Sequence, residues 1–362
     1  MKTMLFLAYV PREGSCTGSQ VRPRKMEQAF CSLGYRVISL WGEPGSASRR
    51  AEIRRFSDRI QRESPLFCYA EGPSGPLFYR EERKLLHEIA VERGIPIGWF
   101  YRDAACFYPE VWAGRPLLDR IKQYPIRFGT REEQRWLEKR VALFFVPTQS
   151  FAVDRGLSPF LPLPPGSDAL RTGFFSTEPR GKRCIYVGGL SHRYGTDLML
   201  RAFARLNRQG EYPLTVVCRP GETEALRPFR GNSWLTVCHE QGRGLAALYE
   251  KQDLALYPLR SGAYQQLVFS VKIPEYLANG LPVAAVYSRE TAAFLQKWGV
   301  GRCCEDREEA FAGLVRDMLE NRREYRNMTE RIALCVKNNQ WKDRARQAAD
   351  ALQPACGKRE ST

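Results

Sequence analysis

The chain has 362 residues, enough for two domains that each bury a core of their own. Hydrophobic residues make up 43% and charged residues 27%, which excludes an intrinsically disordered protein. Lysine and arginine number 56 against 40 aspartate and glutamate, a net charge of +16. The excess is shared evenly between the two sides of Pro165, so it is no basic tail. It indicates an anionic partner, whether phosphate, an acidic lipid surface or nucleic acid.

The opening apolar run, residues 4–10, predicts a core strand and not a signal peptide. It is short, it ends at Pro11, and no small-residue cleavage site follows. No stretch approaches the ~20 apolar residues of a membrane span. The eleven cysteines lack paired metal-binding spacing, and several fall in strand-like runs, so we expect reduced, buried thiols in a cytoplasmic protein.

Short apolar runs alternate with helical periods along the first half, a pattern typical of βαβ units and a parallel sheet. Helices are expected at residues 21–33 and 49–62. In the second of these, Ile53, Phe56 and Ile60 share one face and arginines occupy the rest. Strands are expected at residues 4–10, 35–40, 66–70, 95–101 and 141–146.

The proline-rich segment 161–166 is predicted to join neither sheet and to mark the domain boundary. The alternation then resumes, so the predicted fold class is α/β, with two doubly wound, Rossmann-like domains. A cleft is expected between the carboxyl ends of their strands. The predicted strands of the second half are 184–187, 214–218, 235–238, 254–258 and 282–286, followed by helices at 308–320, 324–337 and 341–352.

The strongest local motif spans residues 269–283, where a loop enters a short helix closed by Gly280 and Pro282. Ser270 and Lys272 stand near the helix start, where free N–H groups and a lysine suit a diphosphate. Glu275, one turn further, can accept hydrogen bonds from a ribose diol. On spacing alone, an ordinary amphipathic helix with solvated Lys272 and Glu275 explains the pattern equally well.

The motif Ser-x-Lys-x-x-Glu-Tyr-Leu-Ala-x-Gly-Leu-Pro-Val resembles the donor-site helix of glycosyltransferase family 4. These are retaining enzymes of the GT-B fold, common in capsule and exopolysaccharide assembly. The resemblance extends over nearly the whole chain. It includes the strand at 253–258, the strand and glycine turn at 185–190, the interdomain Pro-Gly-x-Asp pattern at 164–168, and the last helix at 341–345.

The resemblance implies that Glu275 holds the donor ribose, while Lys272 and Ser270 contact the diphosphate. Gly188 and Gly189 would let the backbone approach the phosphates.

The chain also departs from the family pattern. Leu267 stands where many members have a second glutamate, and Gly189 and Tyr194 stand where a basic pair is frequent. Arg193 is the candidate to supply the missing charge. Arg219, after the strand at 214–218, is a further candidate for phosphate or base contact, and an ion pair with Glu222 or Glu224 is the alternative.

In the first domain, the loop 14–20 lacks the Rossmann glycine spacing. Its Gly18 and Ser19 are expected to shape the acceptor side. Arg22 lies in the first turns of the next helix, where a cation gains nothing from the helix dipole. It therefore favours an anionic ligand, with solvated charge as the alternative.

Residues 99–103, Trp-Phe-Tyr-Arg-Asp, end a predicted strand and are similar to a signature of bacterial polysaccharide-type members of the same family. Many relatives have a His-Asp pair here, and Arg102 replaces the histidine. Asp103 is the candidate carboxylate that orients or deprotonates the acceptor hydroxyl. A carboxylate that caps the turn or pairs with Arg102 is the alternative.

The resemblance implies a retaining glycosyltransferase that moves a sugar from a UDP- or GDP-sugar to a glycan or lipid-linked acceptor in bacterial surface polysaccharide synthesis. The departing diphosphate would take the acceptor proton while Lys272 neutralises its charge. No metal ion, cofactor or nucleic-acid partner is expected. The implied domains are an acceptor domain at 1–165, a nucleotide-sugar domain at 166–338, and a C-terminal helix at 339–362 that crosses back to the first.

Two alternatives stay open. One is a sugar-nucleotide epimerase or hydrolase on the same fold, against which the presence of only three histidines counts. The other is a basic protein at the inner face of the cell membrane, with the helix at 49–62 lying on an anionic leaflet. That peripheral contact is also compatible with a cytoplasmic transferase.

Overall fold

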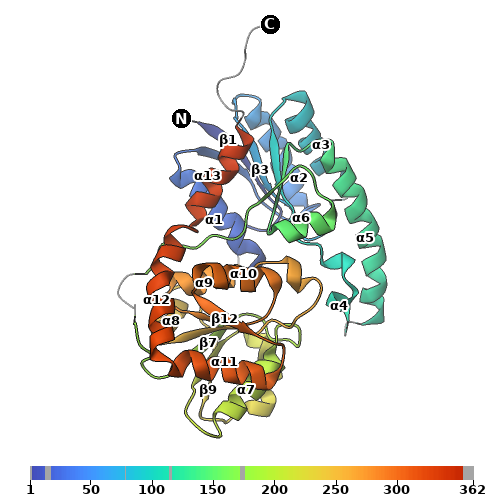
Figure 1. Cartoon of the computed structure of the whole chain (residues 1–362). Coiled ribbons are helices and arrows are strands. Elements are labelled where there is room, and N and C mark those ends of the chain that lie inside the picture. Colours follow the sequence, from blue (N-terminus) through green and yellow to red (C-terminus); the bar gives the residue numbers. More distant parts are fainter. Residues whose placement is uncertain (1, 13–17, 78, 114–115, 172–175, 354–362) are drawn as a thin grey trace. The chain divides into compact units, whose positions relative to one another are not determined.

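The computed structural model describes residues 2–12, 18–77, 79–113, 116–171 and 176–353. The chain forms two compact units (Figure 1). The first comprises Met1–Gly166 together with Trp341–Thr362, and the second is Ser167–Gln340. No helix in the described part of the chain is long and apolar enough to cross a membrane.

The first unit is built on a six-stranded sheet, all parallel, in the order β2-β1-β3-β4-β5-β6. The predicted doubly wound α/β pattern is confirmed, since the chain reverses direction across the sheet between β1 and β3. The strands are β1 (Thr3–Ala8), β2 (Arg36–Leu40), β3 (Cys68–Glu71), β4 (Ile97–Phe100), β5 (Leu143–Val146) and β6 (Phe160–Pro162). The helices are α1 (Gly18–Ser32), α2 (Ala47–Ile60), α3 (Arg80–His87), α4 (Pro109–Trp112), α5 (Leu117–Glu138), α6 (Gln149–Arg155) and α13 (Trp341–Leu352).

The prediction that the proline-rich segment joins neither sheet is wrong. Leu161 and Pro162 belong to β6, which pairs in parallel with β5, and the Leu163 N–H donates to the Val146 carbonyl at 2.7 Å. Because β6 is an edge strand, its outer side needs no hydrogen-bond donors, so a proline is tolerated there.

The C-terminal helix α13 completes the first unit by packing on α1 and on β4 (Figure 1). A Cβ on Gly98 of β4 would stand 2.7 Å from the Leu352 Cδ1 atom and 2.4 Å from Phe145, so only glycine leaves room for this contact. Arg344 donates to the Pro164 carbonyl at 3.1 Å, and Gln353 donates to the Tyr35 hydroxyl at 2.6 Å. The last helix is therefore part of the first unit's core.

One arginine of α2 lies inside the first unit, although the sequence pattern placed it on the solvated face. Arg49 is 1% exposed and forms a two-point ion pair with the buried Glu82. Its third nitrogen donates to the carbonyls of Ala8 at 2.8 Å and Gly42 at 3.1 Å. The apolar face of α2 is buried as predicted, so α2 offers an anionic leaflet only its remaining exposed arginines.

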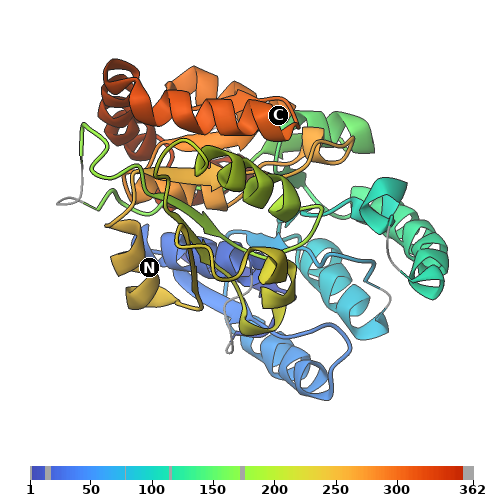
Figure 2. The same cartoon turned by 90° about the horizontal axis from the view of Figure 1, so that it is seen from below.

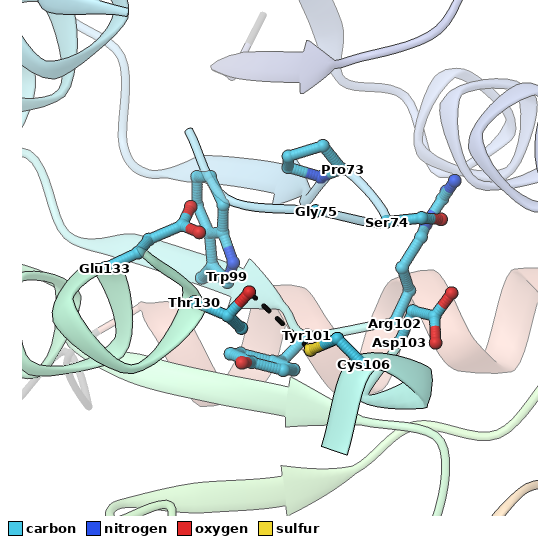
Figure 3. A pocket seen from close by; sticks show the side chains of 10 residues that line it. All are labelled: Pro73, Ser74, Gly75, Trp99, Tyr101, Arg102, Asp103, Cys106, Thr130 and Glu133. Carbon is cyan, nitrogen blue, oxygen red and sulfur yellow. Dashed lines mark hydrogen bonds between the residues drawn. The ribbon is translucent and has the colours of Figure 1, made fainter. Parts of the chain in front are cut away.

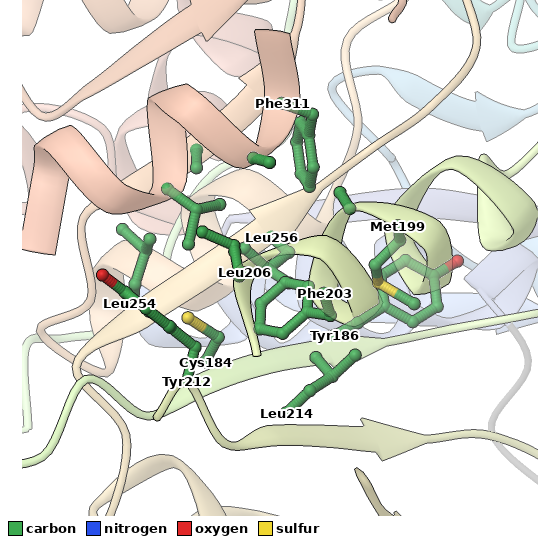
Figure 4. Close-up of a cluster of buried hydrophobic side chains, with 14 of the residues drawn as sticks. Cys184, Tyr186, Met199, Phe203, Leu206, Tyr212, Leu214, Leu254, Leu256 and Phe311 are labelled. Carbon is green, nitrogen blue, oxygen red and sulfur yellow. The ribbon is translucent and has the colours of Figure 1, made fainter. Parts of the chain in front are cut away.

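The second unit repeats the plan with a parallel sheet in the order β12-β11-β10-β7-β8-β9. Its main core lies between the sheet and the helices α7 and α11, where Phe203, Leu256 and Phe311 meet (Figure 4). The strands are β7 (Cys184–Val187), β8 (Leu214–Val217), β9 (Leu235–Cys238), β10 (Leu254–Tyr257), β11 (Val283–Val286) and β12 (Gly301–Cys304). The helices are α7 (Thr196–Leu206), α8 (Gly242–Tyr249), α9 (Lys272–Ala278), α10 (Arg289–Trp298), α11 (Glu308–Glu320) and α12 (Arg322–Lys337).

The pair Cys303-Cys304 lies in the edge strand β12, which the sequence pattern did not predict. Of the four cysteines in predicted strands that were expected to be buried thiols, Cys68, Cys184 and Cys218 are buried and free, whereas Cys238 is free but only half-buried. Burial raises the pKa of the Cys303 thiol to about 12. Such a thiol stays protonated and unreactive at neutral pH.

Replacing Arg49 with alanine is expected to lower the free energy of unfolding by about 3–5 kcal/mol, because Glu82 would remain as a buried, unpaired charge. Arg50→Ala, at the exposed neighbouring position, should change it by less than about 0.5 kcal/mol. Urea denaturation of both variants measures the difference. Equal effects would show that the Arg49–Glu82 pair does not hold α2 to α3.

Candidate functional site

The carboxyl edge of the second sheet carries the predicted donor residues. The chain reverses across this sheet between β7 and β10, and in open α/β sheets ligands bind at that edge beside the reversal. β7 ends at Val187 and leads into the Gly188-Gly189 turn, while α9 begins at Lys272. The Tyr276 hydroxyl of α9 accepts from the Val187 N–H at 3.0 Å. This bond fixes α9 against the end of β7.

Lys272 is partly buried, and its ammonium group faces the rings of two tyrosines. Its Nζ atom lies 4.8 Å from the ring centre of Tyr186 and 5.1 Å from that of Tyr194, and it donates to the Tyr186 hydroxyl at 3.4 Å. Among the described residues, no carboxylate lies within ion-pair distance of the Lys272 ammonium group. The charges of Glu275 and Glu222 raise its pKa from a longer distance. Desolvation lowers the pKa of Lys272 to about 8.

The glycine turn is built for close approach. Gly188 has a φ of 149°, and a Cβ at this position would stand 2.0 Å from the Lys272 Nζ atom. A Cβ on Gly189 would lie 3.2 Å from the Tyr194 ring. Any side chain at position 188 would therefore compete with the ammonium group for the same space.

Glu275 and Ser270 lie on either side of Lys272 in the chain, and each has an internal partner. The buried Tyr249 hydroxyl donates to Glu275 Oε1 at 3.1 Å. Its pKa is raised, mainly because the hydroxyl is buried and also because the negative charge of Glu275 lies close to it. The Ser270 hydroxyl accepts from the Lys272 N–H at 3.3 Å, at the first residue of α9. Tyr249 thus orients the carboxylate that the sequence assigned to the ribose.

The two candidate arginines of this unit differ in their surroundings. Arg193 lies over the Tyr264 ring at 5.6 Å, and its Nε atom is buried without a hydrogen-bond partner in the described structure. Arg219 is exposed and forms the ion pair with Glu222 that the sequence left open as the alternative. Of the two, Arg193 has the unmet hydrogen-bonding capacity that a ligand could satisfy.

In the first unit, Arg22 is held by an internal anion. Its Nε donates to Glu71 Oε1 at 2.9 Å, and its guanidinium group lies 3.5 Å from the Phe100 ring centre. The Tyr69 hydroxyl donates to the same carboxylate at 2.7 Å, and Arg102 reaches the other oxygen at 3.4 Å. The expectation that Arg22 signals an anionic ligand is therefore corrected, because Glu71 at the end of β3 is the anion it binds.

Gly18 and Ser19 begin α1, whereas residues 14–17 of the predicted loop lie outside the described residues. Asp103 caps the turn after β4, since its Oδ1 accepts from the Ala105 N–H at 2.8 Å. The turn-capping alternative is thus what the structure has.

Asp103 and Arg102 also line a small cavity of about 10 Å³, enough for about one water molecule. Figure 3 shows its lining, with Glu133 of α5 beside the Trp99 ring. Burial raises the pKa of Glu133 to about 7, against the opposing effects of the Leu77 N–H and of Arg83. The described residues contain no group of three His, Cys, Asp or Glu side chains placed to hold a metal ion.

Lys272, Gly188, Gly189 and Ser270 thus lie together, as the motif predicted. Sequence reasoning missed Tyr186, Tyr249, Glu71 and Glu133. The sequence did contain a signal for Glu71. It is an acidic residue at the end of an apolar strand-like run, directly before Gly72-Pro73, where a side chain reaches the carboxyl edge of a sheet. Nothing local distinguished Glu133 from the half-exposed Glu132 before it.

Residues 181–321 match the family described as glycosyl transferases group 1. No curated protein sequence matches the chain. Among solved structures, a sucrose-phosphate synthase from Thermosynechococcus elongatus is similar over 97% of this chain and 98% of its own, with a TM-score of 0.69 and 13% identity. WaaG, a glycosyltransferase involved in lipopolysaccharide biosynthesis, is similar over 98% and 100%, with a TM-score of 0.65 and 14% identity. HepE of Anabaena, in complex with UDP and glucose, is similar over 97% and 99%, with a TM-score of 0.65 and 12% identity.

These structures show that the chain has the GT-B fold, with two Rossmann-like units. The matched segment contains both the glycine turn and α9. Fold and segment together support a GT-B glycosyltransferase.

Replacing Glu133 with glutamine is expected to stabilise the protein at high pH. The folded pKa lies above the unfolded value, so the stability contributed by this carboxyl group is complete at low pH and is lost as the pH rises through about 7. Above that pH its ionisation costs roughly 3 kcal/mol, which the neutral amide avoids.

Urea midpoints of wild type and Glu133→Gln should therefore coincide below the unfolded pKa of 4.5 and diverge as the pH rises towards 8. Glu132→Gln, one residue earlier and facing solvent, serves as the control. A Glu133→Gln difference that does not change with pH would contradict the burial of an ionisable Glu133.

Proposed function

We propose that the protein is a retaining glycosyltransferase of family 4 type that transfers a sugar from a UDP- or GDP-sugar to a glycan or lipid-linked acceptor. The observation that carries this proposal is Lys272. It is a partly desolvated ammonium group without an ion-pair partner among the described residues, and it faces a glycine turn at the carboxyl edge of the sheet. Such a site lacks an anion, and a diphosphate supplies one.

The donor would be held by groups of the second unit. Lys272 binds the diphosphate, and the Gly188-Gly189 backbone approaches the same oxygens. Glu275, oriented by Tyr249, accepts hydrogen bonds from the ribose hydroxyls. Arg193 supplies a further cation, with an Nε atom that has no protein partner in the described structure. Ser270, whose hydroxyl accepts from the Lys272 N–H, is assigned to the diphosphate, and the exposed Arg219, paired with Glu222, is assigned a secondary contact with the nucleotide.

Transfer with retention places the departing diphosphate next to the attacking hydroxyl. The leaving oxygen accepts the hydroxyl proton as the bond to the sugar breaks, and Lys272 stabilises the charge that develops on the diphosphate. The proposed step uses no metal ion. Its rate depends on keeping an ammonium group close to the phosphates in a partly dry site.

We assign the acceptor to the first unit. Asp103 and Arg102, which follow β4 and line the small cavity of this unit, are the groups that we propose to face it. Arg22 and Arg102 both bind Glu71, and Gly18 and Ser19, at the start of α1, are assigned to the acceptor side in this proposal. WaaG, named for lipopolysaccharide biosynthesis, supports an acceptor in bacterial surface polysaccharide synthesis, on the cytoplasmic side of the membrane.

Isothermal titration with UDP and GDP, alone and as sugar conjugates, tests the donor site. Lys272→Met and Glu275→Gln are each expected to weaken binding of the preferred nucleotide by roughly ten- to hundredfold, through loss of a charged hydrogen-bond partner. Lys297→Met, which removes an exposed lysine of α10, should leave the affinity unchanged. Unchanged affinity in Lys272→Met would refute the donor site.

The affinity should also depend on pH. Since the free Lys272 has a pKa of about 8, the fraction carrying a charge falls above that pH, and nucleotide binding should weaken accordingly. In Lys272→Arg the cation stays charged, so its affinity should be flat over the same range. A parallel decline in both proteins would mean that another group titrates.

A further inference from the structure

The first half of α5 presents its apolar side chains to solvent, the reverse of an ordinary surface helix. Single exposed apolar residues are common and need no explanation, but a contiguous set marks an interaction surface. The five exposed side chains of this set have exposed fractions between 55% and 73%, and they are Leu117, Leu118, Ile121, Tyr124 and Phe128. We call these five residues the α5 stripe.

The spacing of the α5 stripe places it on one face. Positions 117, 121, 124 and 128 are separated by three or four residues and so align along the helix axis, with Leu118 beside them. The buried residues of α5 lie in its second half, beyond the α5 stripe and on the other side of the helix, and they are Gly129, Thr130, Glu133 and Leu137. Figures 1 and 2 both show α5 at the outside of the first unit. The helix therefore already has a core-facing side, and the α5 stripe is additional to it.

Cations flank the α5 stripe. Arg120, Lys122 and Arg131 are exposed on the same segment, and Arg127 is half-buried against the Phe107 ring. The one acidic residue between positions 117 and 131 is Asp119, which pairs with Lys122 at 3.1 Å. An apolar face bordered by arginine and lysine is the pattern of a helix that lies in the interface of an anionic bilayer.

We propose that the α5 stripe docks the protein on membranes that contain anionic phospholipid. Leu117, Leu118, Ile121, Tyr124 and Phe128 enter the boundary between headgroups and acyl chains, while the flanking cations meet lipid phosphates. A second copy of the chain fits this surface less well, because pairing two α5 stripes would bring their like-charged borders together.

Exposure of the apolar side chains distinguishes α5 from α2 as a membrane-binding helix. The apolar residues of α2, Ile53, Phe56 and Ile60, are buried in the unit's core, so α2 can attract an anionic surface but cannot insert into it. The proposal thus places the membrane contact on α5 and not on the arginine-rich helix that the sequence indicated. It does not depend on the transferase activity.

Flotation of the full-length protein with vesicles tests the docking, using pure phosphatidylcholine and a mixture of phosphatidylcholine with phosphatidylglycerol. Wild type should float with the anionic vesicles and much less with the neutral ones. The variant Leu118→Ser/Ile121→Ser/Tyr124→Ser/Phe128→Ser should lower the partition coefficient at least about tenfold, because it removes most of the inserted apolar area. These residues are exposed, so its thermal unfolding should match that of wild type.

Matched variants distinguish insertion of the α5 stripe from nonspecific hydrophobic binding and from nonspecific electrostatic attraction to the vesicles. Val91→Ser/Val153→Ser/Leu334→Ser removes exposed apolar residues elsewhere and should float like wild type. Arg120→Glu/Lys122→Glu should lose the preference for anionic vesicles, whereas Arg50→Glu/Arg54→Glu on α2 should have a smaller effect.

Three outcomes would overturn the proposal. The first is wild-type flotation by the four-serine variant. The second is equal loss of flotation in the Val91, Val153 and Leu334 control. The third is a wild-type dimer that does not float and that the four-serine substitution converts to a monomer, which would assign the α5 stripe to self-association.

Discussion

An ammonium group that is held partly out of water, with no carboxylate beside it among the described residues, is the constraint around which the second unit is arranged. Desolvation disfavours its charge, and aromatic faces offset only part of that cost. The ends of β7 and α9 meet through Tyr276, and a glycine is required at position 188 so that the Lys272 ammonium fits. The site is thus prepared for a negative ligand before one arrives, which reduces the reorganisation needed on binding.

Three inward-facing arginines of the described structure show a different arrangement. Arg49 has Glu82, Arg22 has Glu71, and Arg260 bridges Asp197 and Asp306. Each of these arginines has a carboxylate partner within its own unit, and the pairing holds elements of that unit together.

Much of the fold could be predicted because buried parallel strands are continuous apolar runs between turn residues. β12 was missed since Arg302 interrupts its pattern, and β6 since prolines normally end a strand. The donor motif was found because its residues lie within one short segment. Its desolvation could not be foreseen, because Tyr186 and Tyr194 come from far earlier in the chain. The inward turn of Arg49 was hidden for the same reason, since its partner Glu82 lies 33 residues away.

The passage of the chain from the first unit to the second and back has a consequence for biosynthesis. The second unit is one continuous segment, and its two ends are joined where the Ser167 N–H donates to the Asn339 carbonyl at 2.7 Å. The first unit is interrupted, and it lacks α13 until the whole of the second unit has been translated. Until then α1 and β4 have no cover where Ala345, Ala349 and Leu352 will be buried. The first unit therefore cannot complete its core during synthesis of residues 1–340. A premature stop codon before α13 leaves the surfaces of α1 and β4 uncovered, even though residues 1–166 are all present.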